Sequence, residues 1–331
     1  MKGPRRRATT TGGRRSIETR RTAVVALGGN ALAPSDERST IADQFRHTRQ
    51  SLAPVVDLVA EGWNVCVVHG NGPQVGDELL RNELARAEVI PLPLGVLVAA
   101  TAGWIGYMIQ QSLENAMRHA GCQGDVVTVI TQVLVSRDDP ALRDPTKFIG
   151  HELSLERAEE LRAEGSVVKP DGRGRLRRVV GSPRPIAVHE VGVIRSLVER
   201  GTVVVACGGG GAPVYLDERL GWEGVDAVVD KDLAAAVLAR DLGAALLLVL
   251  TDVDAVYTHW RTPAQRALAH LTAAEAEALD RDGAFGEGSM APKVRSAIDF
   301  VRRTGGRAII TSLARGQAAI RGAAGTTLTA D

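Results

Sequence analysis

Short and almost wholly apolar runs recur along the chain and alternate with longer helical patterns. Strands that are buried on both faces have this continuous apolar character. The runs cover residues 22–27, 63–69, 126–131, 202–207, 245–251 and 308–311, and the helical stretches cover 41–61, 97–120, 194–200, 231–242 and 294–303. The alternation predicts an α/β fold in three layers, with helices on both faces of a mainly parallel central sheet.

Residues 135–187 break this rhythm. They are polar and rich in Pro, Gly and Arg, and they contain one short helical pattern, LSLERAEELRAEG. We expect a small protruding subdomain at about 135–187, a hairpin with one helix, within a domain that spans 22–331. Because few apolar side chains are available to anchor it, we expect it to be mobile and lid-like.

The charge is distributed unevenly along the chain. Lys and Arg number 40 and Asp and Glu 39, which excludes a strongly basic nucleic-acid binder. Residues 1–21 nevertheless carry eight basic side chains and one acidic side chain. We expect this segment to be a solvated, disordered tail, and a nucleic-acid-binding arm or a transit peptide remain as alternatives.

Composition removes several further classes of function. Aromatic residues make up only 3%, too few for a surface that stacks RNA bases. Cys66, Cys122 and Cys207 lie far apart without a CxxC pair, so we expect neither a disulfide framework nor a metal site. No apolar stretch has the length of a membrane span, and no secretory signal is present. We therefore expect a cytoplasmic protein with no nucleic-acid or membrane partner.

Glycine is concentrated where three of the expected strands end. In parallel α/β sheets ligands bind at the carboxyl ends of the strands, where glycine lets backbone N–H groups approach an anion. The clusters are Gly28, Gly29 and Asn30, then Gly70, Asn71 and Gly72, then Gly208, Gly209, Gly210 and Gly211. Tight turns are the alternative for any one cluster, but three together predict a cradle for phosphate groups. Neither a P-loop nor a GxGxxG motif is present.

Three lysines stand out in a sequence in which lysine is rare and arginine is abundant. Lys147 lies in the protruding segment, Lys231 opens a helical pattern between Asp230 and Asp232, and Lys293 opens another. A compact ammonium charge suits phosphoryl transfer, in which the protein mainly positions and neutralises phosphates.

Taken together, these motifs resemble the carbamate kinase family, which has the amino-acid kinase fold. The resemblance runs in order over residues 22–331. It is carried by TAVVALGGNAL at 22–32, HGNGPQVG at 69–76, GWIGY at 103–107, PTKFIG at 145–150, CGGGG at 207–211, VDKDL at 229–233, TDVDAVY at 251–257 and GSMAPK at 288–293.

The resemblance implies the reaction carbamoyl phosphate + ADP ⇌ carbamate + ATP, with Mg²⁺, in a homodimer of arginine metabolism. By position, Lys147, Lys231, Lys293 and Asp232 would be catalytic, with Asp232 orienting the lysines. The first two glycine clusters would hold the transferred phosphoryl group and the carbamoyl moiety. Thr251, Asp252, Tyr257 and Met290 would lie around the nucleoside.

The sequence departs from the family pattern at a few positions. Many relatives outside the carbamate kinases carry a lysine on the first strand, where this chain has Ala26, and Lys147 would supply that charge. Ala102 replaces a common glutamine, and His151 and Glu152 stand where an apolar or aromatic pair is expected. We expect His151 to lie on the subdomain surface. Two alternatives remain open: a related kinase of another small carboxylate or phosphate, and a non-catalytic protein that binds ATP or an anion.

Overall fold

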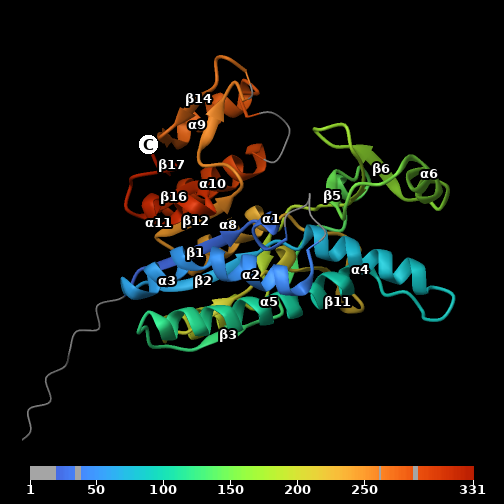
Figure 1. The fold of residues 1–331 in the computed structure, drawn as a ribbon, viewed down its shortest axis with the longest axis horizontal. Helices are drawn as coiled ribbons and strands as arrows, with labels where there is room; N and C mark the ends of the chain where they lie inside the picture. Colours follow the sequence, from blue (N-terminus) through green and yellow to red (C-terminus); the bar gives the residue numbers. More distant parts are fainter. Residues whose placement is uncertain (1–19, 34–38, 261, 286–289) are drawn as a thin grey trace, which may run out of the picture.

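The computed structural model describes residues 20–33, 39–260, 262–285 and 290–331. Nearly all of the expected tail, and Gly288 and Ser289 of the GSMAPK motif, lie outside these residues. Figure 1 shows a layered main body with a smaller part that projects from one side.

An eight-stranded sheet forms the centre of the main body, in the order β15-β17-β16-β12-β1-β2-β9-β3. Its strands pair in parallel except that β17 is antiparallel to β16. The strands are β1 Thr22–Leu27, β2 Asn64–His69, β3 Val126–Thr128, β9 Val203–Val205, β12 Leu246–Thr251, β15 His270–Thr272, β16 Arg307–Ser312 and β17 Thr326–Thr329. The mainly parallel sheet expected from the apolar runs is confirmed.

Helices cover both faces of this sheet, as the alternation of β1 side chains requires. Ala23, Val25 and Leu27 pack into one core, whereas Val24 and Ala26 pack into the other. The first layer contains α2 Ile41–Ser51, α3 Ala53–Ala60, α5 Leu94–His119 and α11 Gly316–Ile320, and the second contains α7 Val191–Glu199, α8 Lys231–Leu242, α9 Ala273–Arg281 and α10 Met290–Thr304. The expected three-layer αβα architecture is therefore confirmed.

Two helical regions differ from the expected pattern, each because of a proline. The single helix expected over 41–61 is divided into α2 and α3, with Pro54 in the first turn of α3. The segment after His69 begins a helix, α4 Gly72–Ala85, with Pro73 in its first turn. Proline lacks an N–H, which costs nothing in the first turn of a helix but breaks a helix interior.

The protruding subdomain is inserted in the chain between β4 and β8. These two strands belong to a separate four-stranded sheet, in the order β11-β10-β4-β8. In place of a simple hairpin with a helix, β5 adds a third antiparallel strand to the β6–β7 hairpin, beside α6. The bounds are β4 Gln132–Leu134, η1 Pro140–Leu142, β5 Lys147–Ile149, α6 Leu155–Ala163, β6 Val167–Pro170, β7 Leu176–Val180, β8 Ala187–Val188, β10 Ala212–Asp217 and β11 Gly221–Gly224.

The subdomain has more apolar contacts than its composition suggested. Ile149, which is 1% exposed, and Val180 pack against Val75 of α4 and Leu97 of α5. The expectation of few apolar contacts is therefore wrong for the base of the subdomain. Its outer part forms a small core of its own around Leu161 and Val168.

The remaining elements are short. They are α1 Gly29–Leu32, η2 Gly208–Gly210, the hairpin β13 Val256–Thr258 and β14 Arg266–Leu268, and η3 Leu313–Arg315. Among the described helices, none combines the length and the apolar character that a membrane span requires.

The contact between α4 and the subdomain leaves no room for a side chain at Gly76. A Cβ atom there would lie 2.1 Å from the Cα atom of Gly150, so Gly76→Ala must push the base of the subdomain away from α4. We expect faster amide hydrogen exchange in β5, measured by mass spectrometry, because displaced strands open more easily. The matched control is Gly172→Ala in the β6–β7 turn, where a Cβ meets nothing within 4 Å. Unchanged exchange in Gly76→Ala would contradict this close contact.

Candidate active site

Four neighbouring parallel strands of the central sheet end at the same edge. In the order β12, β1, β2 and β9, they lead into Thr251 and Asp252, then Gly28, then Gly70, and then Cys207 and the four glycines. The N–H of Gly28 donates to the Leu250 carbonyl at 3.0 Å, and that of Gly70 donates to the Leu27 carbonyl at 3.1 Å. The three glycine clusters found in the sequence therefore converge, as predicted.

Close approach explains why two of these positions are glycine. A Cβ at Gly70 would lie 3.0 Å from the Gly29 nitrogen and 3.1 Å from the Lys231 Cδ atom. Gly209 has φ +67°, and a Cβ there would lie 2.3 Å from the side chain of Asn71. The loops thus pack directly on one another and on Lys231.

The four-glycine segment begins with backbone strain. Cys207 has φ 49°, a left-handed conformation that is uncommon for a residue with a side chain. Its N–H donates to the Thr131 hydroxyl at 3.0 Å, and the glycines then form the single turn η2. Such strain persists only where surrounding contacts fix it, and it is concentrated at functional sites.

Asn71 links the second loop to the long helix α5. Its side chain is 2% exposed and donates from Nδ2 to the Thr101 hydroxyl at 2.9 Å. The next residue, Ala102, lies against the third loop, since a Cβ at Gly208 would come 2.8 Å from the Ala102 Cβ. The side chain of Asn30 lies outside the described part of the structure.

The start of α8 carries the charges of the site. Asp230 accepts a hydrogen bond at 2.8 Å from the backbone N–H of Asp232 and so caps the helix. Asp232 binds Lys231 Nζ at 2.6 Å through Oδ1 and Lys293 Nζ at 3.3 Å through Oδ2. One buried carboxylate, 2% exposed, therefore holds two ammonium groups from different helices.

Lys147 joins this cluster from the protruding subdomain. Its ammonium group forms an ion pair with Asp230 Oδ2. The structure thus brings together Lys147, Lys231, Lys293 and Asp232, as the resemblance implied. It adds Asp230, whose position beside Lys231 was noted in the sequence but whose pairing with a lysine 83 residues away was not foreseen.

Electrostatics keeps both carboxylates ionised, although Asp232 is buried and Asp230 is half-buried. Burial alone would raise the pKa of Asp232, but Lys231 and Lys293 outweigh it and hold the pKa below its usual range. Burial likewise raises the pKa of Asp230, but Lys147 and Lys231 outweigh it, and the pKa lies below its usual range. For Lys231, burial prevails over the attraction of Asp232 and lowers the pKa. The site therefore holds fixed charges of both signs in a partly water-excluded space.

The residues assigned to the nucleoside divide into two groups. Thr251 ends β12 and donates to Asp252 at 3.0 Å, so both lie at the same sheet edge as the glycine loops. Tyr257 lies on β13, donates to Asp254 at 2.5 Å and packs its ring 5.1 Å from that of Trp260. Met290 begins α10 and packs against the apolar core. No described contact joins Tyr257 or Met290 to the lysine cluster.

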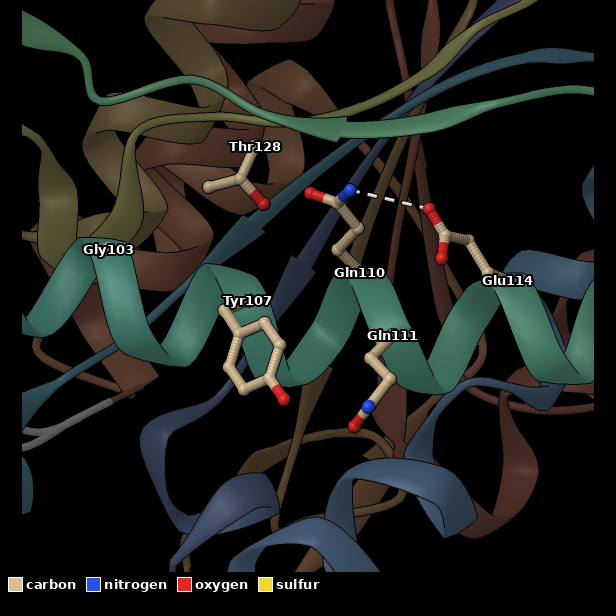
Figure 2. A pocket seen from close by; sticks show the side chains of 6 residues that line it. All are labelled: Gly103, Tyr107, Gln110, Gln111, Glu114 and Thr128. Atoms are coloured by element: carbon tan, nitrogen blue, oxygen red, sulfur yellow. Dashed lines mark hydrogen bonds between the residues drawn. The ribbon is translucent and has the colours of Figure 1, made fainter.

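A surface hollow of about 300 Å³ lies elsewhere, along the exposed face of α5 (Figure 2). It is lined by Gly103, Tyr107, Gln110, Gln111 and Glu114 of α5 and by Thr128 of β3. None of the candidate phosphate-binding residues lines it. His151 also lies outside the cluster, where it contacts Asp77 of α4 at 3.3 Å.

A metal site made only of side chains is not found among the described residues, which contain no suitable group of three or more His, Cys, Asp or Glu. Asp230 and Asp232 are already engaged by lysines. Mg²⁺ commonly binds through substrate phosphates and water with few protein ligands. The described carboxylates of this site therefore offer no preformed set of Mg²⁺ ligands.

Comparison with known proteins finds a family model and individual relatives that agree with one another. The family model described as "Amino acid kinase family" matches residues 21–312. The carbamate kinase of Halobacterium salinarum is 46% identical over 308 residues, 92% of this chain and 97% of the relative. That of Pyrococcus horikoshii is 43% identical over 310 residues, 92% of this chain and 98% of the relative.

A solved structure of a similar protein contains a nucleotide analogue. Carbamate kinase from Giardia lamblia bound to AMP-PNP is 37% identical and superposes with a TM-score of 0.86 over 94% of this chain and 99% of its own. The same enzyme bound to citric acid gives a TM-score of 0.89 with the same identity and coverage. The chain belongs to the amino acid kinase family and, within it, to the carbamate kinases.

Proposed function

We propose that this chain transfers a phosphoryl group reversibly between carbamoyl phosphate and ADP. The observation that carries this proposal is the lysine and aspartate cluster at the edge where the glycine loops converge. Lys147, Lys231 and Lys293 bring three positive charges to one place, and two carboxylates hold them there. Such an arrangement suits phosphoryl transfer, which depends on positioning and charge stabilisation.

The reaction requires one bond to break and one to form. The bond between phosphorus and the carbamate oxygen breaks, while an oxygen of the ADP β-phosphate forms a new bond to phosphorus. Carbamate leaves as an anion, so no general base has to accept a proton. The task of the protein is to hold donor and acceptor in line and to stabilise negative charge on the transferred group.

The three lysines are proposed to divide this task. Lys231 lies against Gly70, between the loops that follow β1 and β2, and is placed to bind the transferred phosphoryl group. Lys293, near Asp252, is placed on the nucleotide side. Lys147 supplies charge from the subdomain, since β1 carries Ala26 and no lysine. Backbone N–H groups of the glycine loops complete the cradle.

Nucleotide binding is supported by the AMP-PNP bound to the Giardia relative. We place the nucleoside near Thr251, Asp252, Tyr257 and Met290. Mg²⁺ would accompany the nucleotide phosphates and neutralise part of their charge. The carboxylates of Asp230 and Asp232 act on the lysines, which they keep in position.

The two alternatives differ from this proposal in testable ways. A related kinase would use another acyl phosphate, and a non-catalytic binding protein would use none. Against the second stands the complete charge cluster. Against the first stands Lys147, because the subdomain supplies the charge that the first strand lacks.

We also propose that the chain works as a cytoplasmic homodimer. The edge strand β3 and the exposed face of α5 offer a surface for a second copy. Tyr107, 57% exposed, and Ile130, 47% exposed, are apolar side chains on this edge. Large exposed apolar side chains grouped on one face are typical of protein interfaces.

The proposed reaction is tested by measuring ATP formation from ADP in a coupled assay, with carbamoyl, acetyl and aspartyl phosphate as parallel donors. We expect carbamoyl phosphate to give the largest kcat/KM. Preference for another donor would favour the related kinase. Nucleotide binding without ATP formation from any donor would favour the non-catalytic protein.

Lys147→Ala tests the charge supplied by the subdomain. We expect turnover to fall roughly 10²–10³-fold, the scale of losing one preorganised electrostatic contact. The Kd for ADP, measured by calorimetry, should barely change because the nucleotide is bound on the other side of the site. Lys169→Ala is the matched control, since Lys169 lies on β6 and pairs with Asp144. Turnover near the wild-type value in Lys147→Ala would refute the assignment.

Asp232 and Lys293 are expected to act as one unit because they are joined at 3.3 Å. Asp232→Asn and Lys293→Ala should each lower kcat at least ~10²-fold. The double variant should be little worse than the more impaired single variant, because each change already misplaces the other group. Steady-state kinetics on all four proteins gives the coupling. A double-variant loss equal to the product of the single losses would show two independent sites.

A further inference from the structure

Glu83 receives two arginines from the protruding subdomain and takes no part in the lysine cluster. It lies near the end of α4 and binds Arg157 of α6 at 2.8 Å through Oε2. Its other oxygen binds Arg178 of β7. One carboxylate of the main body therefore joins the helix and the central strand of the subdomain.

This contact is more buried than the other ion pairs between α4 and the subdomain. The side chains of Arg178 and Glu83 are 11% and 19% exposed, whereas those of Arg86 and Glu164 are 59% and 36% exposed. Exposed pairs contribute little, but a buried charge that loses its partner is strongly unfavourable. Within the described residues the Arg178 Nε atom is buried without a hydrogen-bond partner, so the guanidinium depends on Glu83.

Strand register connects this contact to Lys147. Arg178 lies directly opposite Ile149 on the neighbouring strand β5. Alternate residues of a strand share a face, so Lys147 and Ile149 point the same way. A shift of Arg178 therefore moves β5, and with it the ammonium group that reaches Asp230.

The subdomain lies beside α4 (Figure 1), and contacts near both ends of this helix set its orientation. Near the start of the helix, the Gly150 N–H donates to the Gly72 carbonyl at 3.0 Å, and Gly76 packs on Gly150. Glu83 lies 11 residues further on, about 16 Å along the helix axis at 1.5 Å per residue. Apolar packing of Ile149 on Val75 and the contact at Gly150 hold the subdomain near the start of α4, and Glu83 adds an attachment near the far end of the helix, which restricts tilting of the subdomain.

We propose that Glu83 is a positioning residue for Lys147, because it anchors Arg157 and Arg178 and so sets the angle at which the subdomain presents Lys147 to the phosphoryl group. This inference rests on the function proposed above. Displacement of a catalytic group by about 1 Å can lower the rate by up to ~10²-fold. Loss of the anchor should therefore lower kcat and leave nucleotide affinity unchanged.

A double-mutant cycle separates positioning from a general loss of stability. Glu83→Gln keeps the side-chain shape and removes the charge. We expect kcat with carbamoyl phosphate to fall about 10-fold, with the ADP Kd unchanged. In the Lys147→Ala background the same change should alter kcat less than about 2-fold, because the group it positions is absent. If Glu83→Gln does not fold, Glu83→Asp in both backgrounds gives the same comparison.

Glu164→Gln is the matched control, since it removes an exposed carboxylate that also joins the subdomain to α4. It should leave kcat unchanged. Equal losses from Glu83→Gln in both backgrounds, or an unchanged kcat in the wild-type background, would overturn the proposal. Amide exchange in β5 gives a readout that is independent of the reaction, and it should become faster in Glu83→Gln. If the wild-type chain forms no ATP, the proposed function fails. If amide exchange in β5 is the same in Glu83→Gln as in the wild type, the anchoring role of Glu83 is overturned, whatever the outcome for ATP formation.

Discussion

The arrangement depends on two carboxylates, the buried Asp232 and the half-buried Asp230, that hold three ammonium groups together. Without them, Lys147, Lys231 and Lys293 would repel one another, and each would lose more by leaving water than it gains. Asp232 spans Lys231 and Lys293, and Asp230 binds Lys147 while it caps α8. The helix therefore delivers both counter-charges from its first turn, so their positions are as rigid as the helix itself.

This cluster can work only because the surrounding backbone comes close to it. Four parallel strands end side by side, and glycines in the loops after β1, β2 and β9 let these loops pack closely on one another and on the side chains of Asn71 and Lys231. Close packing brings backbone N–H groups to the same edge as the lysines. The site therefore combines fixed dipoles with fixed charges, and little reorganisation is needed when negative charge develops.

The protruding subdomain adds a charge that the central sheet does not provide. Its base is held on α4 by apolar packing of Ile149 and by the contact between Gly76 and Gly150. Its outer part is held by Glu83. Because α4 begins at the loop formed by Gly70, Asn71 and Gly72, one helix carries both this glycine loop and the support for Lys147. The position of this loop and the attachment of the subdomain therefore depend on the same helix.

The sequence by itself determined the layers of the fold, because short apolar runs that alternate with longer helical patterns are typical of parallel strands buried on both faces. The sequence also identified the glycine clusters and the lysines as candidate site residues, since the motifs that contain them occur in the same order as in one family. The helical patterns read from the sequence did not include α4, whose first turn contains Pro73. Only the tertiary structure decided that Asp230 pairs with Lys147 and that Glu83 binds two arginines of the subdomain, because these contacts join residues 83, 74 and 95 positions apart. Charge pairing over such distances has no periodic signature in a sequence, and it is fixed by how the subdomain packs on α4.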